Sequence, residues 1–275
     1  YEISECLVGS EMCIRDRLSA LVLSALLSFW IGYYPLSPGD VVRAFLARFG
    51  VESSMDKNAV TIFWNIRLPR ILSAVFIGAS LSLAGATYQG MFRDPLVSPD
   101  ILGVSSGAYL GATLAMLLGL GTILGGSAMG VLGCTGAFLV SLAVVGLANL
   151  GGRANAVKLL LAGSALSAVC SGFSNLFIFI LNDDHAASAV VQWSMGSLAG
   201  ADWQSNGVIL PVVLAGTLFF WTQYRNLNLM LLGDESAVTL GTDLHRWRLV
   251  YLLVSALLVG FVVYKAGLIG FVGLL

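Results

Sequence analysis

Charged side chains are scarce in this chain. Lys, Arg, Asp and Glu make up 11% of its 275 residues, whereas a soluble domain carries roughly 25% because its surface must be wetted. The 14 basic and 15 acidic residues give a net charge of -1. No basic surface for nucleic acid is therefore expected, and nucleic-acid binding is excluded. The composition indicates a chain that lies mostly in lipid.

The sequence also holds few residues that could bind a metal or act as a reactive thiol. His185 stands beside two acidic residues, but nothing nearby supplies further ligands, so a solvated turn is the better interpretation. No lysine lies in a Gly-Lys-Ser/Thr phosphate-binding loop. We expect no catalytic residue, no metal and no cofactor. The four cysteines lack the short spacings of a metal or redox pair and are expected to be buried packing residues: Cys6, Cys13, Cys134 and Cys170.

Long uncharged apolar runs are abundant instead. Crossing the bilayer takes about 20 apolar residues in a helix, and every backbone group inside the membrane must be paired within its own segment. The runs therefore predict an all-α fold, a polytopic transmembrane helix bundle of about seven spans. The predicted spans are residues 18–39, 71–92, two helices within 101–152 joined at the glycine-rich turn 119–126, 159–182, 203–224 and 249–264.

Small residues recur four positions apart along several of these spans. Such spacing lets two helices approach closely, so it predicts packing contacts and no substrate site. The positions are Ala74, Gly78 and Ser82, then Gly107 and Gly111, then Gly196 and Gly200.

The two ends of the chain differ in character from the rest. Residues 1–17 mix acidic and basic side chains with two cysteines, which is unlike a signal peptide. We expect a non-native leader there, with a genuine cytosolic tail as the alternative. At the other end the sequence stops inside the apolar run 270–275, so the native protein is expected to be longer.

Basic residues do not orient the bundle. With a cytosolic N-terminus, six basic residues fall on each side of the membrane, whereas an excess on the cytosolic side is usual. The six outer ones indicate either an error in the predicted topology or a docking surface for an acidic partner. They are Arg43, Arg48, Lys57, Arg67, Arg70 and Lys265.

Several motifs follow one another in a recognisable order. They are residues 67–70 (RLPR), 78–85 (GASLSLAG), 93–96 (RDPL), 101–108 (ILGVSSGA), 159–163 (LLLAG), 193–198 (WSMGSL) and 233–235 (GDE). Together they resemble the FecCD-type permeases of ABC importers, which carry iron-siderophores, haem or cobalamin. The resemblance covers residues 18–275.

The resemblance implies a type II importer permease of ten helices, with both termini cytosolic, in the inner membrane of a bacterium. The last three helices are then missing, and residues 18–275 form an incomplete transmembrane domain. The implied partners are two ATP-binding subunits, a periplasmic or lipid-anchored substrate-binding protein, and a second permease subunit, identical or paralogous. The chain itself would not be an enzyme, because separate subunits hydrolyse ATP.

Three sets of residues follow from the resemblance. Arg67 and Arg70, at the start of the second span, would pair with acidic residues of the binding protein; the alternative is snorkelling at the membrane boundary. The fifth helix would line the pathway through sparse polar groups, although serines can also join helices. Those groups are Ser164, Ser167, Ser171 and Asn175.

A short predicted helix after the sixth span would be the coupling helix that docks on an ATPase subunit. Its acidic first turn and final glycine are typical helix boundaries, and an interfacial amphipathic helix is the alternative. The residues are Gly233, Asp234, Glu235, Ala237, Leu240 and Gly241.

Two other classes of protein remain as alternatives. An ion-coupled secondary transporter usually has an ionisable residue within a span, and the predicted spans have none at mid-membrane. A seven-helix receptor or membrane enzyme would need no missing part. Among substrates, ferric siderophore is preferred over haem and cobalamin from the general character of the motifs.

Overall fold

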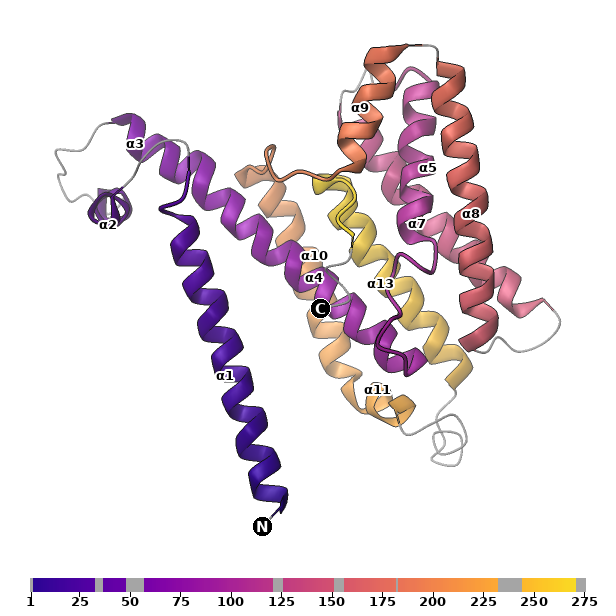
Figure 1. Cartoon of the computed structure of the whole chain (residues 1–275), viewed down its shortest axis with the longest axis horizontal. Coiled ribbons are helices and arrows are strands. Elements are labelled where there is room, and N and C mark those ends of the chain that lie inside the picture. Colours follow the sequence, from indigo (N-terminus) through magenta and orange to yellow (C-terminus); the bar gives the residue numbers. More distant parts are fainter. Residues whose placement is uncertain are drawn as a thin grey trace. The chain divides into compact units, whose positions relative to one another are not determined.

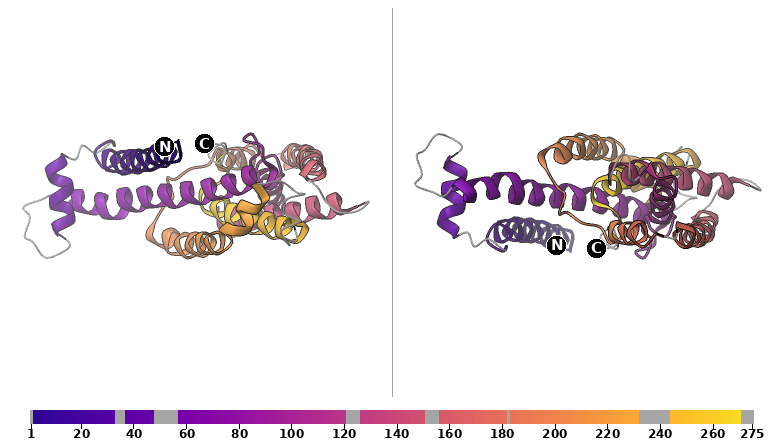
Figure 2. Two further views of the ribbon diagram at one scale, coloured as in Figure 1. Left: turned by 90° about the horizontal axis from the view of Figure 1, so that it is seen from below. Right: turned by 90° about the horizontal axis from the view of Figure 1, so that it is seen from above.

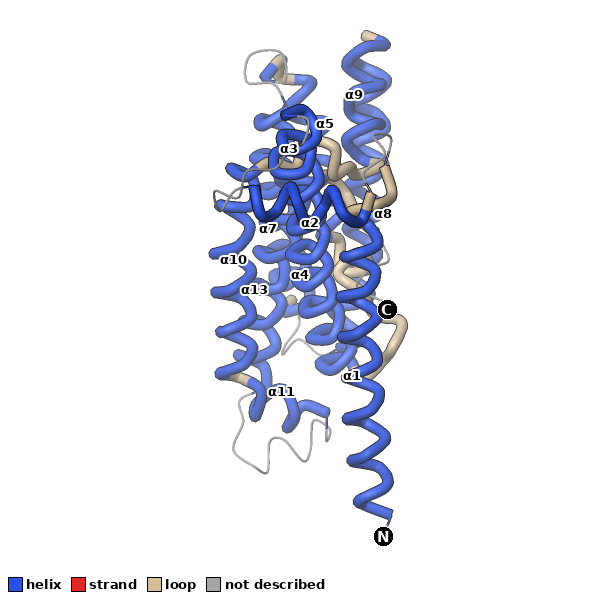
Figure 3. The backbone as a smooth tube through the Cα atoms, turned by 90° about the vertical axis from the view of Figure 1, so that its left-hand side faces the viewer, coloured by secondary structure: helices blue, strands red, loops and turns tan. Residues whose placement is uncertain are grey.

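The computed structural model describes residues 2–32, 37–47, 57–120, 126–150, 156–181, 183–231 and 244–270. All regular secondary structure within these residues is helical, and turns and loops connect the helices (Figure 3). The expected all-α membrane bundle is confirmed. The chain divides into two compact units, Tyr1–Leu72 and Ser73–Leu275, which are described separately below.

The first unit holds three helices, a π-helical segment and the start of a long helix. These are α1 (Glu2–Ser28), α2 (Pro38–Ala47), α3 (Lys57–Ile62), η1 (Phe63–Arg67) and the beginning of α4 (Leu68–Phe92).

The predicted first span, residues 18–39, is wrong at its C-terminal end. Helix α1 already ends at Ser28, and Pro38 begins α2 instead of closing a span. Proline is favoured at a first helical position, where no N–H partner is required. A reciprocal capping pair fixes this start: the Ser37 amide donates to Asp40 Oδ2 at 3.0 Å, and the Asp40 amide donates to Ser37 Oγ at 3.3 Å.

The second span begins earlier than predicted. The sequence indicated residues 71–92, but the apolar helical run extends over Asn58–Phe92. A proline inside a helix normally clashes with the carbonyl four residues before it. Here the helix widens just before Pro69, and the Leu68 amide bonds to the Phe63 carbonyl five residues back. This π-helical turn accommodates the proline, so the helix continues through it.

The second unit contains most of the bundle. Its elements are the remainder of α4, then α5 (Val104–Leu117), α7 (Gly126–Asn149), α8 (Ala156–Leu181), α9 (Asp184–Ser194), α10 (Trp203–Thr222), α11 (Tyr224–Leu231) and α13 (Leu244–Ala266) (Figure 1). Helices α5, α7 and α8 pack together, α7 also packs on α13, and α13 packs on α10. Figure 2 shows α10 on one side of α13 and the group of α5, α7 and α8 on the other.

Five described helices are long and apolar enough to cross a membrane. They are Asn58–Phe92, Ser127–Asn149, Ala156–Leu181, Trp203–Thr222 and Arg246–Ala266, and Val104–Leu117 is a shorter apolar helix. The predicted hairpin within residues 101–152 is present, although its first helix has only 14 residues. A total of seven spans stays a prediction.

Glycines bring α5 and α7 into direct backbone contact. A Cβ atom added to Gly111 would lie 1.9 Å from the carbonyl oxygen of Leu132, and one added to Gly107 would lie 2.7 Å from that of Gly136. The close packing expected at Gly107 and Gly111 is therefore present. By contrast, an added Cβ at Gly78 meets nothing within 4 Å in the described structure.

Two turns with left-handed glycines join the end of α9 to the end of α13. Gly196 has φ 67° and Gly267 has φ 73°. The Ser197 amide donates to the Ala266 carbonyl at 2.7 Å, and an added Cβ on Gly196 would lie 2.4 Å from the Leu268 carbonyl oxygen. Only residues without a side chain allow this conformation and this approach together.

Candidate docking, pathway and coupling surfaces

The two arginines proposed for docking lie within a continuous helical run in the first unit, and not at a helix start as predicted. Arg67 is the last residue of η1, and Arg70 lies in the first turn of α4. Because α3 and η1 precede them, the positive end of the helix dipole lies ten residues earlier, at Lys57.

The surroundings of these two arginines differ. Arg67 is 9% exposed, and its guanidinium donates a hydrogen bond to the Phe29 carbonyl just after α1. It also lies against Gly32, where an added Cβ would be 2.6 Å from Arg67 Nη2. Arg70 is exposed. Arg67 therefore helps to hold the chain after α1, whereas Arg70 presents its side chain to the outside of this unit.

Helix α2 packs beside η1 through aromatic side chains. The Trp64 indole nitrogen donates to the Ala44 carbonyl at 2.9 Å, and the Trp64 ring stacks on Phe45 with centroids 5.9 Å apart. At the other end of α2, hydrogen bonds from Ser37 lower the pKa of the half-buried Asp40 carboxyl. Asp40 therefore keeps a negative charge near neutral pH, which suits the first turn of a helix.

The predicted pathway residues lie on α8 at helical spacing, so they share one face of this helix. Ser164 and Asn175 are exposed, while Ser167 and Ser171 are half-buried. The Ser164 and Ser167 hydroxyls donate to carbonyls of their own helix, at 3.1 and 2.8 Å. Ser174 is fully buried and does the same at 2.9 Å. The first and last residues of this polar face, Ser164 and Asn175, are thus exposed. The hydroxyls of Ser164 and Ser167 make their hydrogen bonds within α8.

The six predicted coupling residues fall within residues 232–243, which lie outside the described part of the chain. The structure describes the helices on both sides of this segment, α11 and α13. Helix α11 follows α10 after the single turn residue Gln223. It is anchored by Met230, which is 1% exposed.

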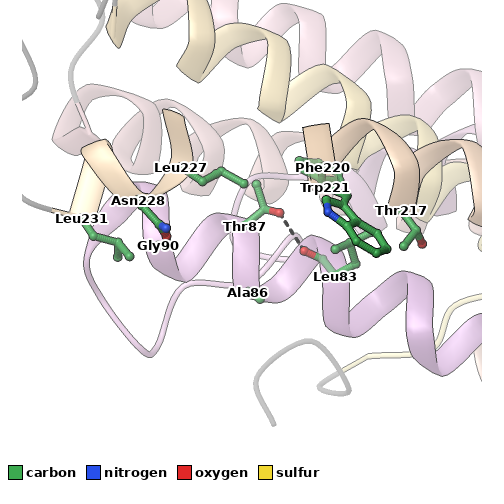
Figure 4. Close-up of a pocket in the computed structure, with 10 residues that line it drawn as sticks. All are labelled: Leu83, Ala86, Thr87, Gly90, Thr217, Phe220, Trp221, Leu227, Asn228 and Leu231. Carbon is green, nitrogen blue, oxygen red and sulfur yellow. Dashed lines mark hydrogen bonds between the residues drawn. The ribbon is translucent and has the colours of Figure 1, made fainter. Parts of the chain in front are cut away.

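A groove that the sequence analysis did not predict lies between three helices: α10, α11 and the C-terminal part of α4. Its volume is about 370 Å³. Thr87 bonds to the Leu83 carbonyl at 2.7 Å, so that hydroxyl is satisfied by its own helix. Figure 4 shows the α11 side chains on one side of the groove and those of α4 on the other. The lining residues are Leu83, Ala86, Thr87, Gly90, Thr217, Phe220, Trp221, Leu227, Asn228 and Leu231.

The turns before α9 and α10 are capped by aspartates. The Asp183 carboxylate accepts from the His185 amide at 2.9 Å, and Asp202 Oδ1 accepts from the Ser205 amide at 2.7 Å. The hydrogen bonds with Ser205, and secondarily the charge of Lys265, lower the pKa of the Asp202 carboxyl. Within the described residues no group of three or more His, Cys, Asp or Glu side chains could hold a metal ion.

Comparison with known proteins identifies the family. Residues 20–275 match the sequence model of the FecCD transport family. The chain belongs to this family. It is 35% identical over 258 residues to the vitamin B12 import system permease protein BtuC of Salmonella typhi, a match that covers 94% of this chain and 74% of that protein.

Two further matches agree. This FecCD-family chain is 40% identical over 222 residues to the hemin transport system permease protein HmuU of Yersinia pestis, covering 78% of this chain and 64% of that protein. A solved structure described as an inward-facing conformation of a metal-chelate type ABC transporter superposes with a TM-score of 0.77. That match has 29% sequence identity and covers 96% of this chain and 79% of the other.

Permeases of the FecCD family are the membrane-spanning subunits of ABC importers, and ATP hydrolysis lies in separate subunits. With its long apolar helices, this FecCD-family chain is a multi-pass membrane protein. Arg67 and Arg70 lie in one compact unit, and the α8 residues lie in the other.

Proposed function

We propose that this chain is the permease subunit of an ATP-driven importer that carries a metal chelate across the bacterial inner membrane. The family match over residues 20–275 is the observation that carries the proposal. The chelate is of the ferric-siderophore, haem or cobalamin class. The relatives named above are permeases for vitamin B12 and hemin, which supports the two macrocyclic chelates at least as well as the siderophore preferred from the sequence.

The proposed docking contact with a substrate-binding protein rests mainly on Arg70. Its guanidinium is exposed and could hold a carboxylate of the partner with two hydrogen bonds. Arg67 supports the same surface from within, because it holds the chain after α1. Charge reversal in Arg70→Glu should affect binding of the binding protein more strongly than thermal stability, whereas Arg67→Ala should lower mainly thermal stability. Equal effects of both substitutions on binding and on stability would contradict this division.

The polar face of α8 is the proposed wall of the pathway, and a second permease subunit, identical or paralogous, supplies the opposite wall. Few hydroxyls and one amide on a helix with exposed apolar side chains suit a passage through which a bulky chelate slides without tight binding. Residues 233–241 are the proposed coupling helix. Their sequence pattern and their place between α11 and α13 support this assignment.

Reconstituted transport tests the proposal. The chain would be placed in liposomes with an ATPase and a substrate-binding protein from the same organism, and uptake of labelled cobalamin, haem and a ferric siderophore would be measured. Uptake of one chelate that requires hydrolysable ATP is the expected result. Uptake driven by an ion gradient without the ATPase would instead show a secondary transporter and refute the proposal.

A further inference from the structure

Helix α2 has one buried face and one exposed apolar face. Ala44 is 0% exposed, on the side where α2 packs on α3 and η1. On the other side, three apolar residues spaced three and four positions apart form a stripe along the helix. They are Val42, Phe45 and Leu46, with exposed fractions of 58, 47 and 42%. About half of each side chain in this apolar stripe is therefore left outside the packing of the first unit.

Charged residues of α2 lie beside the apolar stripe and opposite to it. Arg43 is exposed and follows Val42, so it lies at one edge of the stripe. Asp40, which caps the start of the helix, lies on the opposite side at 3.6 residues per turn. An apolar face with a basic residue at its edge is typical of helices that lie in the surface of a membrane.

The direction of α2 also suits a membrane surface. Figure 1 shows α2 end-on, whereas the helical run from α3 into α4 lies in the plane of the picture, and Figure 3 shows α2 lying across the direction of α1. The run Asn58–Phe92 is long and apolar enough to cross a membrane. In both pictures α2 lies on the side of α3 toward which α1 extends. Because α3 and η1 cover the buried face of α2, the apolar stripe is turned toward that side.

The level of α2 along this run corresponds to the lipid headgroups. Arg93 follows Phe92 directly and marks one boundary of the hydrocarbon. Crossing it takes about 20–25 residues, which places the other boundary between residues 68 and 73. Trp64, on which α2 packs, then lies roughly 6–13 Å beyond this boundary, and the stripe extends about 5 Å closer to it. The headgroup layer is about 5–8 Å thick, so the stripe lies within this layer.

We propose that α2 lies on the surface of the lipid bilayer and inserts its apolar stripe at the boundary between the headgroups and the acyl chains. Arg43 then lies at the level of the lipid phosphates, which its long side chain can reach. Through Trp64, this contact would hold η1 and the exposed Arg70 at a fixed height relative to the bilayer. The contact requires only that the chain crosses a membrane, so it does not depend on the transport of a chelate.

Spin-label accessibility of the whole chain in nanodiscs tests this contact. The nanodiscs would contain phosphatidylethanolamine and phosphatidylglycerol, and the four cysteines would first be replaced by alanine. A nitroxide on Val42→Cys would report collisions with oxygen, which enters lipid, and with a water-soluble nickel complex. Two control positions bracket the result. Leu214→Cys has the same 58% exposure, on the apolar helix α10, and Asn58→Cys is exposed at the beginning of the run Asn58–Phe92.

The ratio of oxygen to nickel collisions at position 42 should resemble that at position 214 and exceed that at position 58 several-fold. Leu46→Cys is a second site on the stripe and should give the same result, also where labelling at position 42 disturbs folding. Nickel collisions as frequent as at position 58 would overturn the proposal, because the stripe would face water. Protection from both reagents would overturn it too, because protein would cover the stripe. Access to nickel that is lost when a substrate-binding protein is added would show a protein partner in place of lipid.

Discussion

Replacing Gly111 with alanine should separate α5 from α7 and destabilise the bundle. The added Cβ would lie 1.9 Å from the Leu132 carbonyl oxygen, 2.6 Å from its carbonyl carbon and 3.1 Å from the Gly133 Cα, whereas ordinary contact begins at 3.4 Å. All three atoms belong to backbone, so no side chain can rotate away. The two helices must therefore move apart by about 1.5 Å at this point, which removes a large part of their local dispersion energy.

The expected cost is about 3 kcal/mol, the upper part of the range for inserting a methyl group into a packed interior. Thermal unfolding of the purified chain in detergent would measure it. Gly146→Ala is the matched control, because Gly146 lies on α7 and an added Cβ there meets nothing within 4 Å. That variant should be neutral or slightly more stable, since alanine is the better helix former. Equal stability of Gly111→Ala and wild type, or equal loss in the control, would refute the reasoning.

Three further predictions concern the second unit. Gly267→Ala should destabilise the chain by about 2 kcal/mol in thermal unfolding, because φ 73° is strained for alanine and the Cβ would lie 2.3 Å from a backbone carbonyl oxygen. The pKa of Asp202 is lowered by its hydrogen bonds with Ser205, so its contribution to stability is present at neutral pH and is lost as the pH falls below about 4. Asp202→Asn keeps a capping side chain and should remove this loss, which pH titration of the unfolding temperature would detect. Ser73→Ala breaks the buried hydrogen bond from Ser73 Oγ to Asn206 Oδ1 at 2.6 Å and should cost about 1 kcal/mol in the same assay.

The long helices of the second unit could be predicted from the sequence because each is an apolar run of bilayer length bounded by charge or glycine. The predicted helix at 159–182 corresponds to Ala156–Leu181, and the one at 203–224 corresponds to Trp203–Thr222. Their boundaries depend on local residues such as the Asp202 cap, which lies immediately before α10. Such signals are readable without knowledge of the rest of the fold.

Two helix boundaries were predicted wrongly, the end of the first span and the start of the second. In both cases a backbone hydrogen bond near a proline sets the boundary. The predicted second span begins only at residue 71, and a helix that runs through Pro69 would normally meet a clash between the proline ring and the carbonyl four residues before it. The π-helical bond from Leu68 to Phe63 removes that conflict, and nothing in the composition of the segment signals it. Likewise, Pro38 was interpreted as the end of a span, although the Ser37–Asp40 capping pair makes it a helix start.

The candidate site was less accessible to sequence reasoning, because its properties depend on contacts between distant residues. Two arginines three positions apart looked equivalent, yet only the structure shows Arg67 bonded to a carbonyl 38 residues away. The contact between the turns at Gly196 and Gly267 is of the same kind. The 193–198 motif contains Gly196, but its partner lies about 70 residues later and no spacing rule connects them.

Helices of the second unit differ in how closely they pack. This difference matters for a transporter, in which some parts must move relative to others. At α5 against α7, and at the turns following α9 and α13, backbone lies directly on backbone, so these parts can move only as blocks. At α11, by contrast, Met230 is buried in the core and side chains of the helix line a groove beside α4 and α10. A permease driven by separate ATPases needs one element that yields and others that transmit movement without deforming. Helices α11 and α13 flank residues 232–243, the proposed coupling segment, so movement of that segment would act directly on both of them.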